Sequence, residues 1–87
     1  MNTRNNWEQL RDFANEELKK RNAMLSVYEA EDNLYDVDIL YGLDFNAEPF
    51  DITKYQECET FASNYYEHEL ADVITEAWHY AWNKLNK

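Results

Sequence analysis

The residues of this sequence that could do chemistry are mainly carboxylates. Between Glu31 and Asp51 the chain carries seven Asp and Glu residues and no Lys, Arg or His. Within this stretch Asp36 and Asp38 alternate with apolar residues, as in a half-buried strand. Residues two apart on a strand lie about 6.6–7 Å from each other, close to the spacing of successive backbone phosphates. The pattern therefore predicts a strand that presents carboxylates in the way that a nucleic acid presents phosphates.

Such a strand could enter a groove built for nucleic acid. These grooves hold phosphates with Lys and Arg, and carboxylates satisfy the same donors. An aromatic ring beside the acids could imitate the stacking surface of a base. We therefore expect a partner-binding site whose acids are Glu31, Asp32, Asp36, Asp38 and Asp44 and whose stacking groups are Tyr35 or Tyr41.

An alternative is that these acids only solvate an exposed sheet face and guard its edges against aggregation. The charge distribution favours a partner. Residues 22–83 hold fourteen acids and one base, Lys54, whereas residues 1–21 hold four acids and five bases. A surface that only confers solubility mixes both signs, and like charges facing each other destabilise a sheet. With a net charge of −10, we expect the chain to repel nucleic acid and acidic membranes and to attract basic protein surfaces.

The elements that position these acids are a helix and a hairpin. Apolar spacing predicts a helix over about 6–21, with Asn5 as its N-cap. From Met24 the pattern has a period of two, with a turn at 31–33 and a second strand over 35–41. A short third strand near 43–46 is a further expectation.

The C-terminal half is predicted to be helical. Thr53 and Gln56 form a capping-box pattern that opens one helix. Its apolar positions point away from those of the last segment, so we expect a break near 63–68, with Asn64 and Glu67 capping a second helix. Residues 1–87 are thus predicted to form a single small α+β domain: an N-terminal helix, an antiparallel hairpin or three-stranded sheet, and two C-terminal helices.

No pattern of an enzyme is present. The spacing of His68, Asp72, Glu76 and His79 places them on one helical stripe, which a metal could use but which a solvated face explains better. Cys58 is expected to be a small core residue rather than a nucleophile. We therefore predict a non-catalytic protein without a metal or other cofactor.

A second hypothesis is a small protein-interaction module. Trp82 and Tyr66 lie at the border of the predicted apolar face or outside it, and aromatic residues at the surface are typical of interfaces. The chain could then assemble through the aromatic surface of its C-terminal helix, for example as a homodimer.

Small size, strong acidity, high aromatic content and the predicted element order together resemble phage-encoded anti-defence proteins. This class includes DNA-mimic inhibitors of restriction enzymes and anti-CRISPR proteins. The resemblance implies a basic nucleic-acid-binding partner in the cytoplasm of a bacterial host. A cytoplasmic site also agrees with the single cysteine and with the lack of a long apolar segment. The cluster at 19–21, Lys-Lys-Arg, departs from a uniform DNA mimic.

Overall fold

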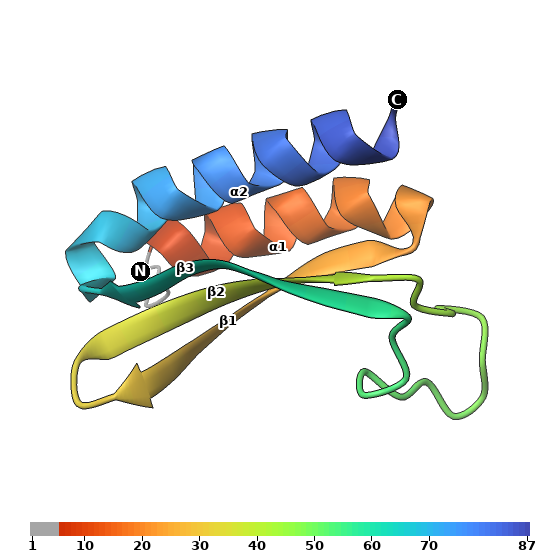
Figure 1. Cartoon of the computed structure of the whole chain (residues 1–87), viewed down its shortest axis with the longest axis horizontal. Helices are drawn as coiled ribbons and strands as arrows, with labels where there is room; N and C mark the ends of the chain where they lie inside the picture. Colours follow the sequence, from red (N-terminus) through yellow and green to blue (C-terminus); the bar gives the residue numbers. More distant parts are fainter. Residues whose placement is uncertain (1–5) are drawn as a thin grey trace.

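The computed structural model describes residues 6–87, with two α-helices covering one face of a three-stranded sheet (Figure 1). In chain order the elements are α1 (Asn6–Leu18), the 3-10 turn η1 (Lys19–Arg21), β1 (Ala23–Glu31), β2 (Leu34–Tyr41), β3 (Glu57–Tyr65), the 3-10 turn η2 (Glu67–Glu69) and α2 (Leu70–Leu85). The strands are antiparallel and lie in the order β1-β2-β3. The prediction of an α+β fold with an antiparallel sheet is confirmed. The predicted N-cap Asn5 lies outside the described residues.

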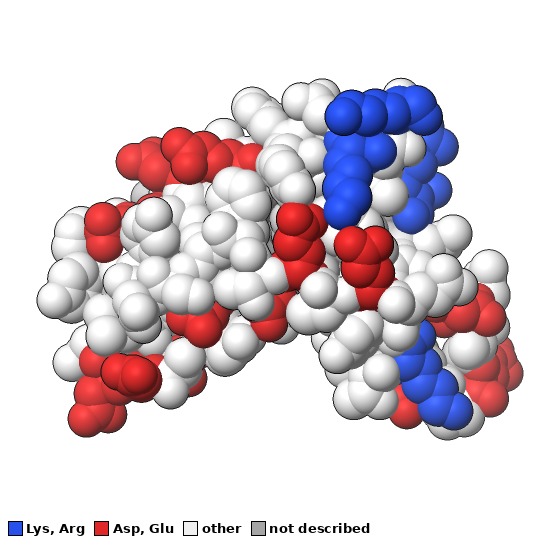
Figure 2. Space-filling view, in the orientation of Figure 1, with Lys and Arg blue, Asp and Glu red and all other residues white. Residues whose placement is uncertain are grey.

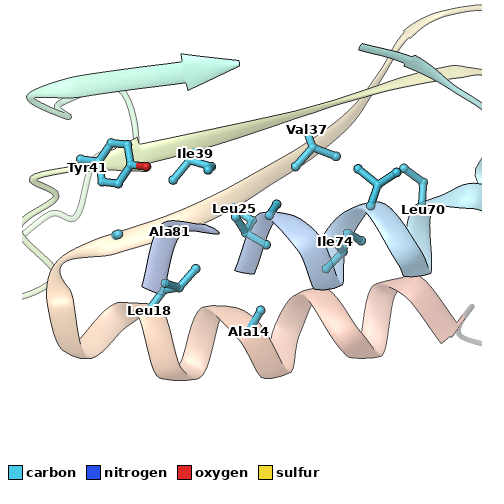
Figure 3. Packing of buried hydrophobic residues seen from close by; sticks show 12 residues of the cluster. Ala14, Leu18, Leu25, Val37, Ile39, Tyr41, Leu70, Ile74 and Ala81 are labelled. Atoms are coloured by element: carbon cyan, nitrogen blue, oxygen red, sulfur yellow. The ribbon is translucent and has the colours of Figure 1, made fainter. Parts of the chain in front are cut away.

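A hydrophobic core fills the space between the helices and the sheet (Figure 3). Side chains from four elements are fully buried in it, namely Leu18, Leu25, Ile39 and Ile74. Because successive residues of a strand point to opposite faces, burial of Leu25 and Ile39 turns their chain neighbours away from the helices. No helix within residues 6–87 has the length and apolar character needed to span a bilayer.

The hairpin between β1 and β2 is closed by Asp32 and Asn33. Asn33 has a φ of 62°, a left-handed conformation that Asn tolerates better than most residues. Its N–H donates to Glu29 Oε2 at 2.8 Å, and the register shifts between Glu29 and Glu31. This turn fixes the register in which Asp36 pairs with Tyr28 and Asp38 with Ser26.

Two predicted features of the C-terminal half are wrong. The first of the two C-terminal helices is strand β3, and the proposed capping residue Thr53 instead bonds to Asp51, with its hydroxyl 2.6 Å from Asp51 Oδ1. The apolar residues of this segment fit a helical period by spacing, but Glu57 and Glu59 alternate with Cys58 as strand residues do. A short segment cannot be assigned by apolar period alone.

The predicted break near 63–68 is a junction between β3 and the helical end of the chain, not between two helices, and other residues cap it. Tyr66 precedes η2, and its N–H donates to Glu69 Oε1 at 3.0 Å; Asn64, the predicted cap, lies in β3 with a φ of 65°. The expected strand near 43–46 is a loop in which Asp44 Oδ1 accepts the N–H of Asn46 at 2.9 Å. The carboxylate of Asp44 therefore stabilises a turn there.

Gly42 ends β2 at a position that favours glycine. Its φ is 73°, and a Cβ atom there would lie 2.7 Å from the side chain of Gln56. We expect Gly42→Ala to lower the free energy of unfolding by about 1–2 kcal/mol, measured by urea denaturation. Gly42→Asn should cost less, because Asn tolerates this backbone conformation better than Ala. Equal stability of the Ala variant and the wild type would contradict this explanation.

Candidate partner-binding face

The sheet has one face that the helices do not cover, here called the open face. Its residues alternate with the core positions of the strands. They include Ser26, Tyr28, Asp36, Asp38, Cys58 and Thr60, together with Met24 and the buried Leu40 near the end of β2. The register pairs Tyr28 with Asp36 and Thr60 with Asp38. Two acids of the predicted site therefore lie side by side on β2 in the middle of this face.

Asp38 has an unusual environment for an acid on a sheet surface. Its Oδ2 accepts the hydroxyl of Tyr28 at 3.0 Å. Its Oδ1 is buried, and no hydrogen-bond donor reaches it within the described part of the chain. Asp38 thus keeps one carboxylate oxygen away from water without a partner, which costs free energy.

Tyr28 was not among the predicted site residues. It is 42% exposed, and the hydrogen bond to Asp38 raises the pKa of its phenol, with a smaller contribution from burial. Its ring lies on the open face beside both aspartates. The signal for it was present in the alternation of β1, but only the pairing of β1 with β2 brings Tyr28 next to the acids.

The other predicted acids are spread along the sheet. Asp36 Oδ1 accepts the backbone N–H of Asn64 at 3.1 Å and so links β2 to β3. Glu31 and Asp32 lie exposed at the hairpin tip. Asp44 lies beyond the opposite end of β2, in the loop. The structure therefore brings Asp36 and Asp38 together and places the remaining acids at the two ends of the row.

The two predicted stacking residues face the helices. Tyr35 lies 5.9 Å from Trp7 of α1, measured between ring centroids. Tyr41 is 6% exposed and packs in the core. Neither ring lies on the open face with Asp36 and Asp38, so Tyr28 is the aromatic residue that the fold places there.

Cys58 also differs from expectation, because it is exposed rather than part of the core. Its place on β3 is opposite Leu40. Partial burial, and next the negative charge of Asp38, raise the pKa of its thiol. A raised pKa keeps the thiol protonated and makes it a poor nucleophile.

On the helix side, Glu59 of β3 ties the sheet to α2. It accepts the hydroxyls of Tyr41 at 3.0 Å and Tyr80 at 2.6 Å, and Lys84 Nζ at 3.3 Å. The hydrogen bond from Tyr80 is the main cause that lowers the pKa of Glu59. Burial, followed by the bond to Glu59, raises the pKa of Tyr41 well above its usual range. The network keeps Glu59 charged and both phenols neutral.

This network predicts a dependence of stability on pH. Because folding lowers the pKa of Glu59, its contribution is full above the unfolded value of about 4.3 and is lost as pH falls through the folded pKa. We expect the stability difference between the wild type and Glu59→Gln to be largest near pH 7 and to shrink as pH falls below about 4. Urea denaturation at a series of pH values measures it. A stability difference that stays constant down to pH 3, on the order of one unit below the unfolded pKa of Glu59, would contradict the role of the charge.

Charge is unevenly distributed over the folded molecule. Figure 2 shows most of the Lys and Arg atoms of this view gathered at the end where α1 and α2 terminate, with a further basic group at the lower right and with Asp and Glu in separate patches over the rest. The basic residues near that end are Lys19, Lys20, Arg21, Lys84 and Lys87. Lys84 is neutralised locally, because it lies 3.3 Å from Glu57 and from Glu59. The sheet and its hairpin tip therefore form an anionic surface.

The aromatic residues of the second hypothesis do not form one compact patch. Trp82 is half-buried, and the guanidinium of Arg21 lies 5.6 Å from its ring centroid. Tyr66 is 54% exposed but precedes α2, so the turn η2 and about 18 Å of α2 separate it from Trp82. A dimer interface could use either residue but not both in a small area.

The stripe of His68, Asp72, Glu76 and His79 forms no metal site in the described structure. Within residues 6–87 no three His, Cys, Asp or Glu side chains are grouped so that they could hold an ion.

Comparisons with protein-family models, with curated proteins and with solved structures find no match to the chain.

Proposed function

We propose that this protein is a non-catalytic inhibitor that occupies the nucleic-acid-binding groove of a basic partner. The open face enters the groove, and its carboxylates take the place of phosphates. The partner would be a bacterial defence or DNA-processing protein, such as a CRISPR effector or a restriction enzyme. The inhibitor would then act in the cytoplasm of the host cell.

The observation that carries this proposal is the environment of Asp38. No donor among the described residues reaches its buried Oδ1, and Asp36, which points to the same face, adds a second negative charge. A neutral β-branched residue would suit the position of Asp38 better, whereas Asp36 also accepts the backbone N–H of Asn64. A small domain has a total stability of only about 5–15 kcal/mol. Acids that cost stability at such sites are the residues expected to serve binding instead.

Binding would satisfy these acids. An Arg or Lys of the groove could donate to Asp36 directly and could replace the Tyr28 hydroxyl on Asp38. Displacing that hydroxyl would free the exposed Tyr28 ring to stack on a side chain that normally holds a base. The net charge of −10 would steer the molecule toward a basic groove and raise the association rate.

Capture from a bacterial lysate tests the proposal. We expect the immobilised protein to retain a nucleic-acid-binding protein, and we expect an excess of duplex DNA to prevent capture by competing for the groove. Affinity should fall as salt rises, because exposed charges are screened beyond about 10 Å at 0.1 M. A captured partner whose affinity ignores both salt and DNA would contradict mimicry and would favour the interaction-module hypothesis.

A further inference from the structure

The two outer edges of the sheet are protected differently. On β1, the side chain of Asn15 from α1 binds the backbone of Leu25 twice. The Leu25 N–H donates to Asn15 Oδ1 at 2.7 Å, and Asn15 Nδ2 donates to the Leu25 carbonyl at 3.2 Å. The amide of Asn15 thus occupies the place of a neighbouring strand and closes this edge at Leu25.

The bonds of Asn15 also reveal which way the backbone of β3 points. Because both polar groups of Leu25 point away from β2, those of its partner Ile39 point toward β3. Glu59, which pairs with Ile39, then directs its N–H and C=O back to β2. By alternation, Cys58 and Thr60 direct theirs to the outer edge of β3.

This edge is open in the described part of the chain. The sheet order ends at β3, and Cys58 and Thr60 are both exposed. Register shifts follow Thr60, where Val37 pairs with Ala62 and Tyr35 with Tyr65. Such bulges bend a strand and disturb regular pairing, so the regular part of the edge is short and runs over 57–60.

The charges near the edge decide what could pair with it. Glu57 and Glu59 line the helix side of β3, and on the open face Asp38 of the neighbouring strand β2 lies beside Thr60. Lys84 of α2 forms ion pairs with both of these glutamates. A second copy would bring the same acids and a further net charge of −10, which opposes pairing of β3 with itself. A basic segment has the complementary charge.

We propose that an extended basic segment of the partner adds a strand to the outer edge of β3. Its backbone would pair with Cys58 and Thr60, and its Lys or Arg side chains would lie beside Glu57 and Glu59. This inference rests on the proposed function, because it assumes the same basic class of partner. It adds a second contact surface next to the open face.

A synthetic peptide of nine residues, on the order of one strand length, with alternating Lys and Thr, serves as the probe. Amide hydrogen exchange is followed by NMR on the whole protein with saturating peptide. At ten times the dissociation constant, exchange of the Cys58 and Thr60 amides should slow by about tenfold. The Glu59 amide, which points to β2, should change less. The same peptide with Glu in place of Lys, and a version N-methylated at alternate residues, should bind much more weakly.

The matched variants are Thr60→Pro and Thr60→Ala. Proline removes the outward N–H at a place where edge strands tolerate it, and we expect it to weaken peptide binding by about tenfold, whereas alanine should not. Equal binding by both variants, with unchanged exchange at Cys58 and Thr60, overturns edge pairing, as does the absence of binding. Either result leaves the open face to be judged separately on its own aspartates. If the Glu peptide binds as tightly as the Lys peptide, the basic partner assumed by both proposals is contradicted.

Discussion

Replacing Asp36 and Asp38 together by Asn is expected to weaken binding of the captured partner by more than about a hundredfold. Each charge-assisted hydrogen bond contributes about 1.5–3 kcal/mol, and the two changes remove two such contacts at the centre of the open face. The affinity is measured by titration at low salt, where the electrostatic contribution is largest.

The stability of the same variant tests the other half of this argument. Asn keeps an oxygen that can accept from the Tyr28 hydroxyl and the Asn64 N–H, the donors that these aspartates now use. Neutralising them weakens those bonds but removes mutual repulsion, and it replaces the charged Oδ1 of Asp38, which no donor among the described residues reaches, by part of a neutral amide. We therefore expect a melting temperature close to that of the wild type. A clear drop in melting temperature with intact binding would contradict the mimic hypothesis for this strand.

A control variant with the same change of net charge tests whether the position of the neutralised acids matters for binding. Glu16 on α1 and Glu76 on α2 are exposed and belong to the helical layer rather than to the open face. The double change Glu16→Gln and Glu76→Gln should reduce affinity only slightly, through weaker long-range steering. If it weakens binding as much as the aspartate pair does, net charge alone governs the interaction.

The hairpin that carries the site was accessible from the sequence, because alternation between apolar and acidic residues is a local signal. β3 was not, because its identity depends on pairing with β2 and on Glu59, a strand residue bonded by Tyr41, Tyr80 and Lys84. A carboxylate on the covered side of a sheet looks like a helix-surface residue until its partners are known. Tertiary contacts therefore outweighed the local pattern there.

The candidate site was likewise predictable only in part from the sequence. Asp36 and Asp38 follow from the period of one strand, but Tyr28 follows only from the register between two strands. Tyr35 and Tyr41 share the parity of the core residue Ile39, so their direction toward the helices was implicit in the pattern. The closed edge at Leu25 rests on a helix side chain ten residues earlier, and a lone Asn carries no signal of that kind.

That edge contact leads to the second large effect, a loss of stability in Asn15→Ala. The change leaves the N–H and the C=O of Leu25 without the partner they now share. Each unsatisfied group costs about 1–3 kcal/mol, so we expect a loss of about 2–4 kcal/mol, because water can reach part of this edge. Urea denaturation measures the loss, with the neighbouring exposed change Glu16→Ala as the control.

A second consequence of Asn15→Ala distinguishes edge protection from ordinary stabilisation. The variant exposes the paired positions of β1 as a template for another strand. We therefore expect it to self-associate at concentrations where the wild type does not, measured by light scattering, and the association should strengthen with salt because the copies repel each other. Asn15→Asp should be intermediate, since a carboxylate can accept the Leu25 N–H but cannot donate to its carbonyl. A variant that is destabilised but shows no self-association at any salt concentration would mean that Asn15 stabilises the packing of α1 on β1 without guarding the edge.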